Sequence, residues 1–431
     1  MAAFSQKNLI FLISQPRAGS TLTQRILGTH PEIYTVSEPW IMLHPLYALR
    51  GDGYQAEYSV QNSKKALDSF LNLHPEGEDA YFQAVRQMSL NLYEGLLRGS
   101  DKNYFLDKTP RYYYIIPELY RTFPEAKYIF LIRNPLAILC SYFKTFVQEH
   151  WWKIQYYQDD LLKAPSLIAQ SLNYFQGSSI VLKYEKLLGN PEEEIKKVCR
   201  FINVDFDAKI INYGNFYPGK WQFGDQSLIQ RQIKPSSDNL NRWKEDLHNP
   251  ITWQSANNYL EFLGQDLLTC LGYSYTEIKD LLERLKPKSE VILPPALQEF
   301  FSSASMFLDK SLQPFLGIVG STAQLFDTYL NLGRVLLEKD HLEPALKYLQ
   351  IALQVAPSVP EAHYLMGEGF LRLGKLDQAV SAYQKAVQLG SVHHRSQLDS
   401  AKFALKQALQ LNPTHQAIAE LLETLSTGQK I

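Results

Sequence analysis

The sequence has few cysteines, almost no net charge and no long apolar run. Its three cysteines, Cys140, Cys199 and Cys270, lie far apart and form no CxxC pair, which argues against a disulfide framework and favours a reducing compartment. A formal net charge of -1 gives no general attraction to nucleic acid or acidic membranes, so any anion site must be local. No stretch approaches the roughly 20 apolar residues that a membrane helix needs. We therefore expect a cytoplasmic protein without a membrane span or a nucleic-acid partner.

The length of 431 residues is sufficient for two folded units. Short apolar, β-branched or aromatic runs alternate with helix-length segments, which predicts a parallel α/β sheet. These runs are residues 8–14, 103–107, 127–133 and 178–183. The first run leads directly into Pro-Arg-Ala-Gly without a cleavage site, so we interpret it as a buried strand and not as a signal peptide. Ligands bind such sheets where the strands end, which directs attention to residues 15–21, 108–110 and 134–141.

A repeat occupies the C-terminal part of the chain. Small residues that would let two antiparallel helices approach closely recur after 34 positions, the period of tetratricopeptide repeats. Gly333, Ala345 and Ala352 recur as Gly367, Ala379 and Ala386. A third, degenerate unit is indicated by Ala408 and Pro413, and residues 416–425 are expected to form a capping helix.

The sequence therefore predicts three segments. Residues 1–285 are expected to form an α/β domain with a P-loop-like three-layer fold and a parallel central sheet. Residues 286–321 contain Lys-Pro-Lys, a Pro-Pro pair and serines, and are expected to form a linker with a helical segment. Residues 322–431 are expected to form an all-α domain of two clear repeats and one degenerate repeat.

The loop after the first predicted strand has the features of a phosphate cradle. It reads QPRAGST at residues 15–21 and leads into a helix-forming segment. A strand, a glycine-containing turn and a hydroxyl-rich helix start present free backbone N–H groups and the positive end of the helix dipole to an anion. A plain turn with a helix cap would use the same residue types. Ser20 stands where the loop GxxxxGK[ST] has its lysine, which disfavours ATP or GTP hydrolysis.

The segment PRAGST resembles the PRSGTT and PKSGTT loops of sulfotransferases that use 3′-phosphoadenosine 5′-phosphosulfate, PAPS, as their donor. In that family the loop holds the 5′-phosphosulfate. The resemblance implies that Arg17 takes the basic place and that the rest of the loop also binds the donor. Those further residues are Ala18, Gly19, Ser20 and Thr21.

A second segment, YIFLIRNPLAILCSYF at residues 128–143, is similar to the strand and helix with which this family binds the nucleotide 3′-phosphate. Arg133 and Ser141 are eight positions apart, as in the family. An Arg at a strand end and a Ser one or two turns into the next helix can hold one phosphate by charge and by a hydroxyl hydrogen bond. A 3′-phosphate distinguishes PAPS from ATP. Taken alone, Arg-Asn-Pro is also common where a helix begins.

Two further segments extend the resemblance over roughly residues 5–270. LKYEKLL, at residues 182–188, is similar to RYEDLL, in which the Tyr helps to hold the nucleotide, and this implies the same role for Tyr184. The segments IKP and NRW resemble IKP…LSKW of tyrosylprotein sulfotransferases, where a Lys closes over the phosphates. Lys234 takes that place, with residues 219–228 as the preceding loop. A solvent-exposed Lys and a Trp packed in the core would account for the same two segments without a role in nucleotide binding.

Sulfuryl transfer needs an in-line acceptor oxygen, a base for its proton and cations for the leaving phosphate, and it requires no metal. In the tyrosylprotein branch the base is a Glu, and Glu38 lies 21 positions after Arg17, as in that branch. The segment DKTP resembles the DKTP or NKDP of the family, which implies that Lys108 neutralises charge on the bridging oxygen. A surface Glu before a proline and a solvated Lys are the structural alternatives. His30 is expected to pack or cap and not to act as the base.

The resemblance thus implies a sulfotransferase that moves the sulfuryl group from PAPS to an acceptor hydroxyl and releases 3′,5′-adenosine bisphosphate. The hydroxyl could belong to a peptide tyrosine, a glycan, a lipid or a small molecule, and the repeats could bind a protein partner. A non-catalytic nucleotide-binding scaffold and a nucleoside or sugar kinase are the alternatives. The joint presence of Glu38 and Lys108 opposes the scaffold, and the missing lysine opposes the kinase.

Overall fold

The computed structural model describes most of the N-terminal two thirds of the chain and parts of the remainder. The described residues are 4–36, 38–51, 53–172, 175, 177–216, 233–289, 291–310, 329–330, 333–334, 336–337, 342–355, 357, 359–389, 402, 406, 409, 416, 418, 419 and 422. The chain divides into two compact units, Met1–Pro314 and Phe315–Ile431.

Five parallel strands form the sheet of the first unit in the order β2-β3-β1-β4-β5. They are β1 (Leu9–Ser14), β2 (Ile33–Thr35), β3 (Tyr104–Asp107), β4 (Lys127–Ile132) and β5 (Ser179–Lys183). Every residue of β1 is buried, as its continuous apolar sequence and its central place require. The four predicted strands are confirmed to within one residue at their ends. Strand β2 has only three residues, too few for a pattern in the sequence to indicate it.

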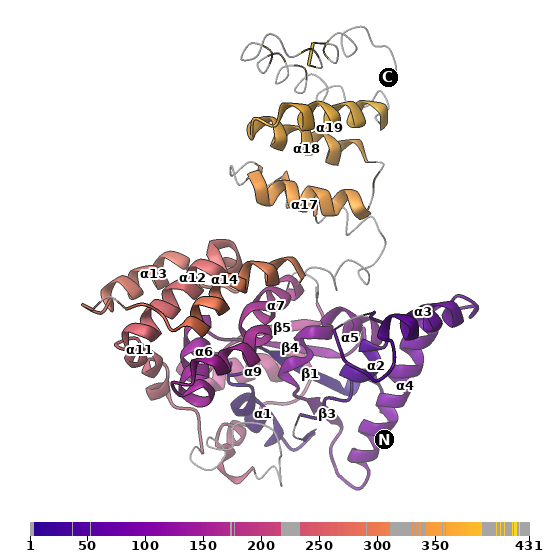
Figure 1. The fold of residues 1–431 in the computed structure, drawn as a ribbon. Coiled ribbons are helices and arrows are strands. Elements are labelled where there is room, and N and C mark those ends of the chain that lie inside the picture. Colours follow the sequence, from indigo (N-terminus) through magenta and orange to yellow (C-terminus); the bar gives the residue numbers. More distant parts are fainter. Residues whose placement is uncertain are drawn as a thin grey trace. The chain divides into compact units, whose positions relative to one another are not determined.

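Alternate residues of the strands face two different layers of helices. Ile10 and Leu12 of β1 belong to the core that includes Ile26 of helix α1 (Ser20–Gly28) and Ile195 of helix α9 (Pro191–Ile202). Phe11 points the other way and contacts the rings of Tyr112 and Phe123 at centroid distances of 6.3 and 5.4 Å. Helices therefore cover both faces of the sheet (Figure 1), and the predicted three-layer α/β fold is confirmed.

The chain connects these strands so that a ligand-binding edge is created. The first three strands in sequence build one half of the sheet, with β3 beside β1, and the chain then crosses to the other side of β1 to form β4. The C-terminal ends of β1 and β4 therefore flank a topological switch point, where open α/β sheets bind ligands.

The helices of the first unit are α1 (Ser20–Gly28), α2 (Leu43–Tyr47), α3 (Val60–Leu71), α4 (Glu78–Leu97), α5 (Ile116–Thr122), α6 (Pro135–Tyr142), α7 (Ala164–Leu172), α8 (Tyr184–Gly189), α9 (Pro191–Ile202), α11 (Arg242–Asp246), α12 (Pro250–Cys270), α13 (Tyr275–Arg284) and α14 (Pro295–Lys310).

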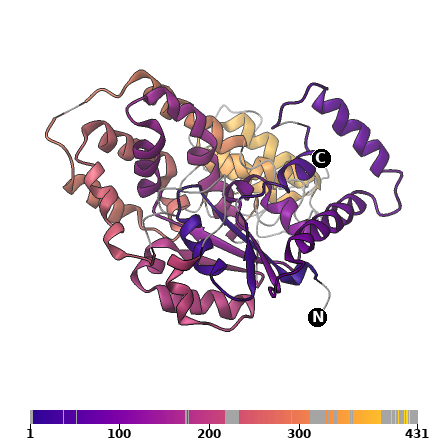
Figure 2. The same ribbon diagram turned by 90° about the horizontal axis from the view of Figure 1, so that it is seen from below.

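Short 3-10 and π-helical turns join several of these elements. They are η1 (Gln6–Asn8), η2 (Pro110–Ile115), η3 (Phe143–Val147), η4 (Trp151–Tyr157), η5 (Asp159–Lys163), η6 (Ala208–Ile211), η7 (Tyr213–Asn215) and η8 (Ser237–Asn239). Helices α3 and α4 project from one side of the first unit, as both ribbon views show (Figures 1 and 2).

Helix α14 lies in the segment for which the sequence predicts a linker. Its residues Leu297 and Phe300 are fully buried in the core of the first unit, so this part of the chain packs as a component of that unit. The first compact unit ends at Pro314. The segment boundaries at residues 285 and 321 stay sequence-based predictions.

The second unit contains the helices α17 (Leu342–Val355), α18 (Pro360–Arg372) and α19 (Leu376–Leu389). A Cβ atom on Gly333 would lie 2.6 Å from the Leu349 side chain, and one on Gly367 would lie 2.7 Å from the Tyr383 ring. The recurring glycines thus allow the close helix contacts that the repeat pattern predicts. Ala408 and Pro413, which mark the degenerate repeat, lie outside the described residues, and the expected capping helix is described only at isolated positions.

Candidate active site

The loop after β1 makes a tight turn that leads directly into helix α1. Arg17 has a φ of 71° and Gly19 a φ of 103°, and α1 begins at the next residue. Gly19 has no side chain with which to cap the helix, so the N–H groups of the first turn receive no side-chain cap and could bind an anion. Ala18, Ser20 and Thr21 are buried around this turn. The structure thus places the predicted loop at a glycine turn before a helix, and its role as a phosphate cradle stays a prediction.

Arg17 connects the loop to the helix that follows β4. Its Nε donates a hydrogen bond to Ser141 Oγ at 3.0 Å, and its guanidinium also donates to Thr145 Oγ1 at 3.3 Å. In return, Arg133 Nη1 donates to the carbonyl oxygen of Arg17 at 2.9 Å. Arg133 and Ser141, predicted to hold one phosphate together, thus meet at the same place, but Arg17 lies between them.

Tyr184 closes this side of the site from the end of β5. The Arg133 guanidinium lies over its ring, 4.5 Å from the centroid. A Cβ atom on Gly19 would lie only 2.4 Å from Tyr184 Cδ2, so the ring packs directly on the glycine. Arg133 Nε is buried and finds no hydrogen-bond partner among the described residues. A buried donor of this kind is costly unless a ligand satisfies it, which makes the residues a fitting anion site.

Glu38 and Lys108 form an ion pair at the other half of the same sheet edge. Lys108 follows β3, and its Nζ donates to Glu38 Oε1 at 2.8 Å. The Lys108 side chain is fully buried, and that of Glu38 is 13% exposed. The Trp40 indole N–H donates to the second carboxylate oxygen of Glu38 at 3.3 Å. The two predicted catalytic residues are therefore in contact, and the solvated alternatives for them do not hold.

A buried carboxylate anchors the backbone beside Lys108. Asp107 accepts hydrogen bonds from the hydroxyls of Tyr93, Tyr112 and Thr109 at 2.6, 3.0 and 2.8 Å. Burial raises the pKa of Asp107 to about 6, although these hydrogen bonds act in the opposite direction. Asp107 stands beside Lys108 in the motif DKTP, but the motif does not reveal that the hydroxyls of Tyr93 and Tyr112 hold its carboxylate.

A second buried carboxylate organises the region between the two halves. Asp160 accepts two hydrogen bonds from Arg111, at 3.0 and 2.5 Å, and one each from the hydroxyls of Tyr113 and Tyr142 at 2.7 and 2.9 Å. Its backbone carbonyl accepts from Gln15 of the phosphate loop at 2.8 Å. No sequence pattern indicates a role for Asp160 or Arg111, since their pairing joins residues that are far apart in the chain.

Two other residues considered from the sequence stand apart from these clusters. Lys234 is exposed, and no hydrogen bond or ion pair joins it to another described residue. Its predicted loop, residues 219–228, lies outside the described residues. His30 Nε2 lies 2.7 Å from the Asp205 carbonyl, and its Nδ1 accepts from the Glu32 N–H at 3.2 Å. Both ring nitrogens of His30 therefore contact backbone groups of the protein.

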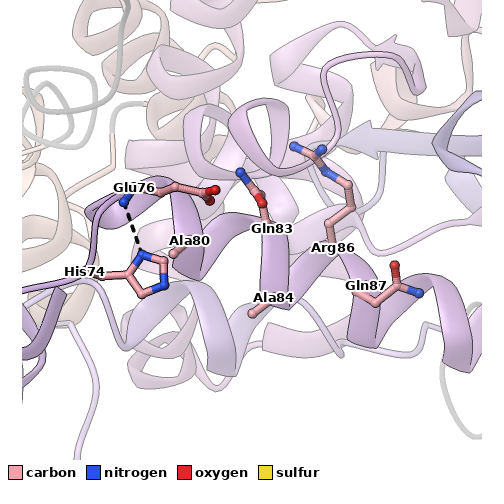
Figure 3. Close-up of a pocket in the computed structure, with 7 residues that line it drawn as sticks. All are labelled: His74, Glu76, Ala80, Gln83, Ala84, Arg86 and Gln87. Atoms are coloured by element: carbon pink, nitrogen blue, oxygen red, sulfur yellow. Dashed lines mark hydrogen bonds between the residues drawn. The ribbon is translucent and has the colours of Figure 1, made fainter.

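A hollow of about 500 Å³ lies elsewhere on the first unit. Figure 3 shows its lining side chains on α4 and on the turn before it, with the hydrogen bond from the Glu76 N–H to His74 Nδ1. No predicted site residue lines it, and five of its seven lining residues are exposed. It is lined by His74, Glu76, Ala80, Gln83, Ala84, Arg86 and Gln87.

Within the described part of the chain, no group of three or more His, Cys, Asp or Glu residues is placed to hold a metal ion. No described helix has the length and apolar character to cross a membrane. The three cysteines are unpaired, as predicted.

Comparison with protein families identifies both parts of the chain. Residues 9–208 match the sulfotransferase family, and residues 360–389 match the tetratricopeptide repeat. Both resemblances drawn from the sequence are confirmed.

Individual relatives are distant. The nodulation protein NoeE of Sinorhizobium fredii is 28% identical over 287 residues, which cover 62% of this chain and 66% of that protein. A putative protein-tyrosine sulfotransferase of Caenorhabditis briggsae is 24% identical over 278 residues, covering 63% of this chain and 91% of that protein. Among solved structures, the sulfotransferase domain of the Synechococcus PCC 7002 olefin synthase is 22% identical with a TM-score of 0.40, covering 57% of this chain and 90% of that domain.

Proposed function

Residues 9–208 belong to the sulfotransferase family, and from this premise we propose that the protein transfers the sulfuryl group of PAPS to an acceptor hydroxyl. The observation that carries the proposal is the meeting of two clusters at one sheet edge. Arg17, Arg133 and Ser141 gather at the ends of β1 and β4, and the Lys108–Glu38 pair lies at the ends of the neighbouring strands β3 and β2.

The first cluster suits the donor nucleotide. The loop amides after β1 and the Arg17 guanidinium would bind the 5′-phosphosulfate, while Arg133 and Ser141 would bind the 3′-phosphate. The buried Arg133 Nε, which has no partner among the described residues, supports this assignment because a phosphate oxygen could satisfy it. Tyr184 would hold the nucleotide from the end of β5, and Lys234 is proposed to approach from the loop side.

The second cluster suits the transfer step. Glu38 would accept the proton of the acceptor hydroxyl as its oxygen bonds to sulfur, while the bond between sulfur and the bridging phosphate oxygen breaks. Lys108 and Arg17 would stabilise the negative charge that 3′,5′-adenosine bisphosphate takes with it. Because Lys108 already contacts Glu38, the base and the leaving-group cation are held beside each other.

The acceptor is proposed to be a hydroxyl, with a peptide tyrosine as the first candidate. Support comes from relatives that are named protein-tyrosine sulfotransferases and from the place of Glu38 in the sequence. The tetratricopeptide repeats are proposed to bind a protein partner or the acceptor chain, and the location is proposed to be cytoplasmic. Unchanged acceptor turnover and unchanged partner binding after removal of the chain beyond residue 325 would leave the repeats a structural role only.

The proposal can be tested with sulfur-radiolabelled PAPS and a set of acceptors that contains a tyrosine peptide, a glycan, a lipid with a free hydroxyl and p-nitrophenol. Release of 3′,5′-adenosine bisphosphate in equal amount with label on one acceptor is the expected result. A protein that binds the nucleotide but transfers label to no acceptor would instead fit the scaffold alternative.

A further inference from the structure

We propose that Trp40 is a positioning residue for Glu38, held in place by the Asp160–Arg111 pair. This inference rests on the proposed function, because it concerns the base of that reaction. Three observations carry it: the backbone conformation of Trp40, the hydrogen bond of its indole, and the buried anchor behind it.

The backbone of Trp40 is held in a conformation that bulky residues avoid. Its φ is 57°, in the left-handed region, which costs an ordinary L-residue roughly 1–2 kcal/mol. Such residues persist where their surroundings hold them and gather at functional sites. Trp40 lies two residues after Glu38, with Pro39 between them. This turn directs the indole back toward the carboxylate that precedes it.

The indole and Lys108 hold the two oxygens of Glu38 separately. Trp40 Nε1 donates to Oε2 at 3.3 Å, and Lys108 Nζ donates to Oε1 at 2.8 Å. The donors come from different parts of the chain, so together they fix both the place and the plane of the carboxylate. Each oxygen keeps further lone pairs with which to accept a proton. If Lys108 moves toward the leaving group, the indole remains to hold Glu38.

The ring of Trp40 is supported by an arginine that is paired with a buried carboxylate. The Arg111 guanidinium lies 5.5 Å from the ring centroid, where a cation is attracted to the indole face. Two hydrogen bonds join Arg111 to Asp160, whose side chain is only 3% exposed. Burial would lower the pKa of Arg111, but Asp160 outweighs it and raises that pKa above its ordinary value. The support under Trp40 therefore stays charged.

This arrangement is comparable to a catalytic triad, because one group, here Trp40, orients the base, here Glu38. The role of Trp40 is to limit the orientations of Glu38, so its loss should lower turnover without weakening donor binding. Displacement of a reacting group by about 1 Å can cost roughly 10²-fold in rate. The loss of one of two orienting donors is expected to cost about 10-fold.

A double-mutant cycle tests whether Trp40 acts through Glu38. Trp40→Phe keeps an aromatic ring over Arg111 but removes the indole N–H. It is combined with Glu38→Gln, and release of 3′,5′-adenosine bisphosphate is measured with p-nitrophenol as the probe acceptor. Trp253→Phe is the matched control, since Trp253 also donates its indole N–H to an acceptor within the protein, in this case the Leu282 carbonyl at 2.8 Å.

We expect Trp40→Phe to lower kcat about 10-fold in the wild-type protein, with donor KM unchanged, and to have less than about a 2-fold effect when Glu38 is already Gln. The same loss in both backgrounds, or no loss in the wild-type background, would overturn the positioning role alone. Full turnover by Glu38→Gln would overturn the proposed base together with its positioning residue.

A spectroscopic measurement needs no acceptor. In protein labelled with nitrogen-15 tryptophan, the Nε1–H resonance of Trp40 is assigned by its absence from Trp40→Phe. Glu38→Gln should shift this resonance, because it replaces a charged hydrogen-bond acceptor by a neutral one, and should leave the resonance of Trp253 in place. An unshifted Trp40 resonance would mean that the indole does not bind Glu38, and the inference would fail.

Discussion

The two halves of the sheet edge differ in how their charged side chains are paired. At the ends of β2 and β3, Lys108 is fully buried and its charge is matched by Glu38. At the ends of β1, β4 and β5, Arg133 contacts a carbonyl oxygen and a tyrosine ring, and its buried Nε has no partner among the described residues. One half thus has its charges paired within the protein, and the other leaves positive charge for a ligand.

This difference separates two kinds of consequence. Removal of one partner from a buried ion pair leaves an uncompensated charge, so changes in the paired half should affect both chemistry and folding. Changes in the other half should mainly affect ligand binding, because the contacts of Arg133 among the described residues, a carbonyl oxygen and a tyrosine ring, include no carboxylate. Four substitutions test the contrast, beginning with the largest expected effect.

Glu38→Gln should lower turnover by about 10² or more, the scale of a lost general base, and should leave the affinity for 3′,5′-adenosine bisphosphate nearly intact. Steady-state kinetics and calorimetric titration measure the two quantities. Glu32→Gln is a suitable control, since Glu32 precedes β2 and so lies at the opposite end of that strand. Undiminished turnover by Glu38→Gln would remove Glu38 from the role of base.

The stability of the first unit should depend on pH through Asp107. Its pKa is about 6 in the folded protein against an ordinary value of 3.8, so the folded state binds this proton more tightly than the unfolded state. The contribution to stability is therefore full below about pH 4 and falls as the pH rises through about 6, by about 3 kcal/mol. Asp107→Asn should remove this part of the pH dependence.

Denaturant unfolding at several pH values measures this effect as the difference between wild type and Asp107→Asn. The Asn side chain can still accept from the two tyrosine hydroxyls, while Thr109 can accept from its amide. Asp101→Asn, at an exposed site, should retain the wild-type pH dependence. Parallel curves for wild type and Asp107→Asn would show that the buried carboxylate does not titrate in this range.

Ser141→Ala should weaken binding of 3′,5′-adenosine bisphosphate by about 1–3 kcal/mol, as expected for a lost hydrogen bond to a charged group, and should leave ADP affinity unchanged. Thermal unfolding should change little, since Ser141 is part of the half that is expected to serve ligand binding. Equal losses for the two nucleotides would place Ser141 away from the 3′-phosphate. Its contact with Arg17 would then be its main role.

Gly19→Ala should weaken binding of the bisphosphate by about 10-fold, because the new methyl group would force the Tyr184 ring away from Arg133 and strain a backbone with a φ of 103°. Gly99→Ala separates the two causes. Gly99 has a φ of 81° and no atom within 4 Å of an added Cβ, so it adds strain without displacing a ring. Normal binding by Gly19→Ala would show that Tyr184 can move without affecting the nucleotide.

The contrast between the two halves also separates what the sequence could predict from what it could not. The strands and the glycine turn after β1 follow from local patterns, since strand ends and turns are encoded in consecutive residues. The roles of Arg17 and Arg133 were implied by the family resemblance. The meeting of Glu38 with Lys108 was implied by resemblance, but their direct ion pair depends on the pairing of β2 with β3. Strand β2 was too short to be recognised.

Long-range partners were the features that could not be predicted. Asp160 is held by Arg111 and Tyr142, and Asp107 is held by Tyr93, across separations that no local pattern encodes. Buried carboxylates gain their roles from residues brought together only by the fold. The core position of α14 has the same origin, because prolines and serines before and after it suggest a linker from the sequence alone.

Calorimetric titration of the whole chain with 3′,5′-adenosine bisphosphate, compared in one buffer with ADP and ATP, tests the central claim most directly. It requires no knowledge of the acceptor. We predict that the bisphosphate binds about 10-fold or more tightly than ADP, because Arg133 and Ser141 would each give the proposed 3′-phosphate a charged hydrogen bond worth about 1.5–3 kcal/mol. Equal affinities, or a preference for ATP, would contradict a PAPS site at the ends of β1 and β4.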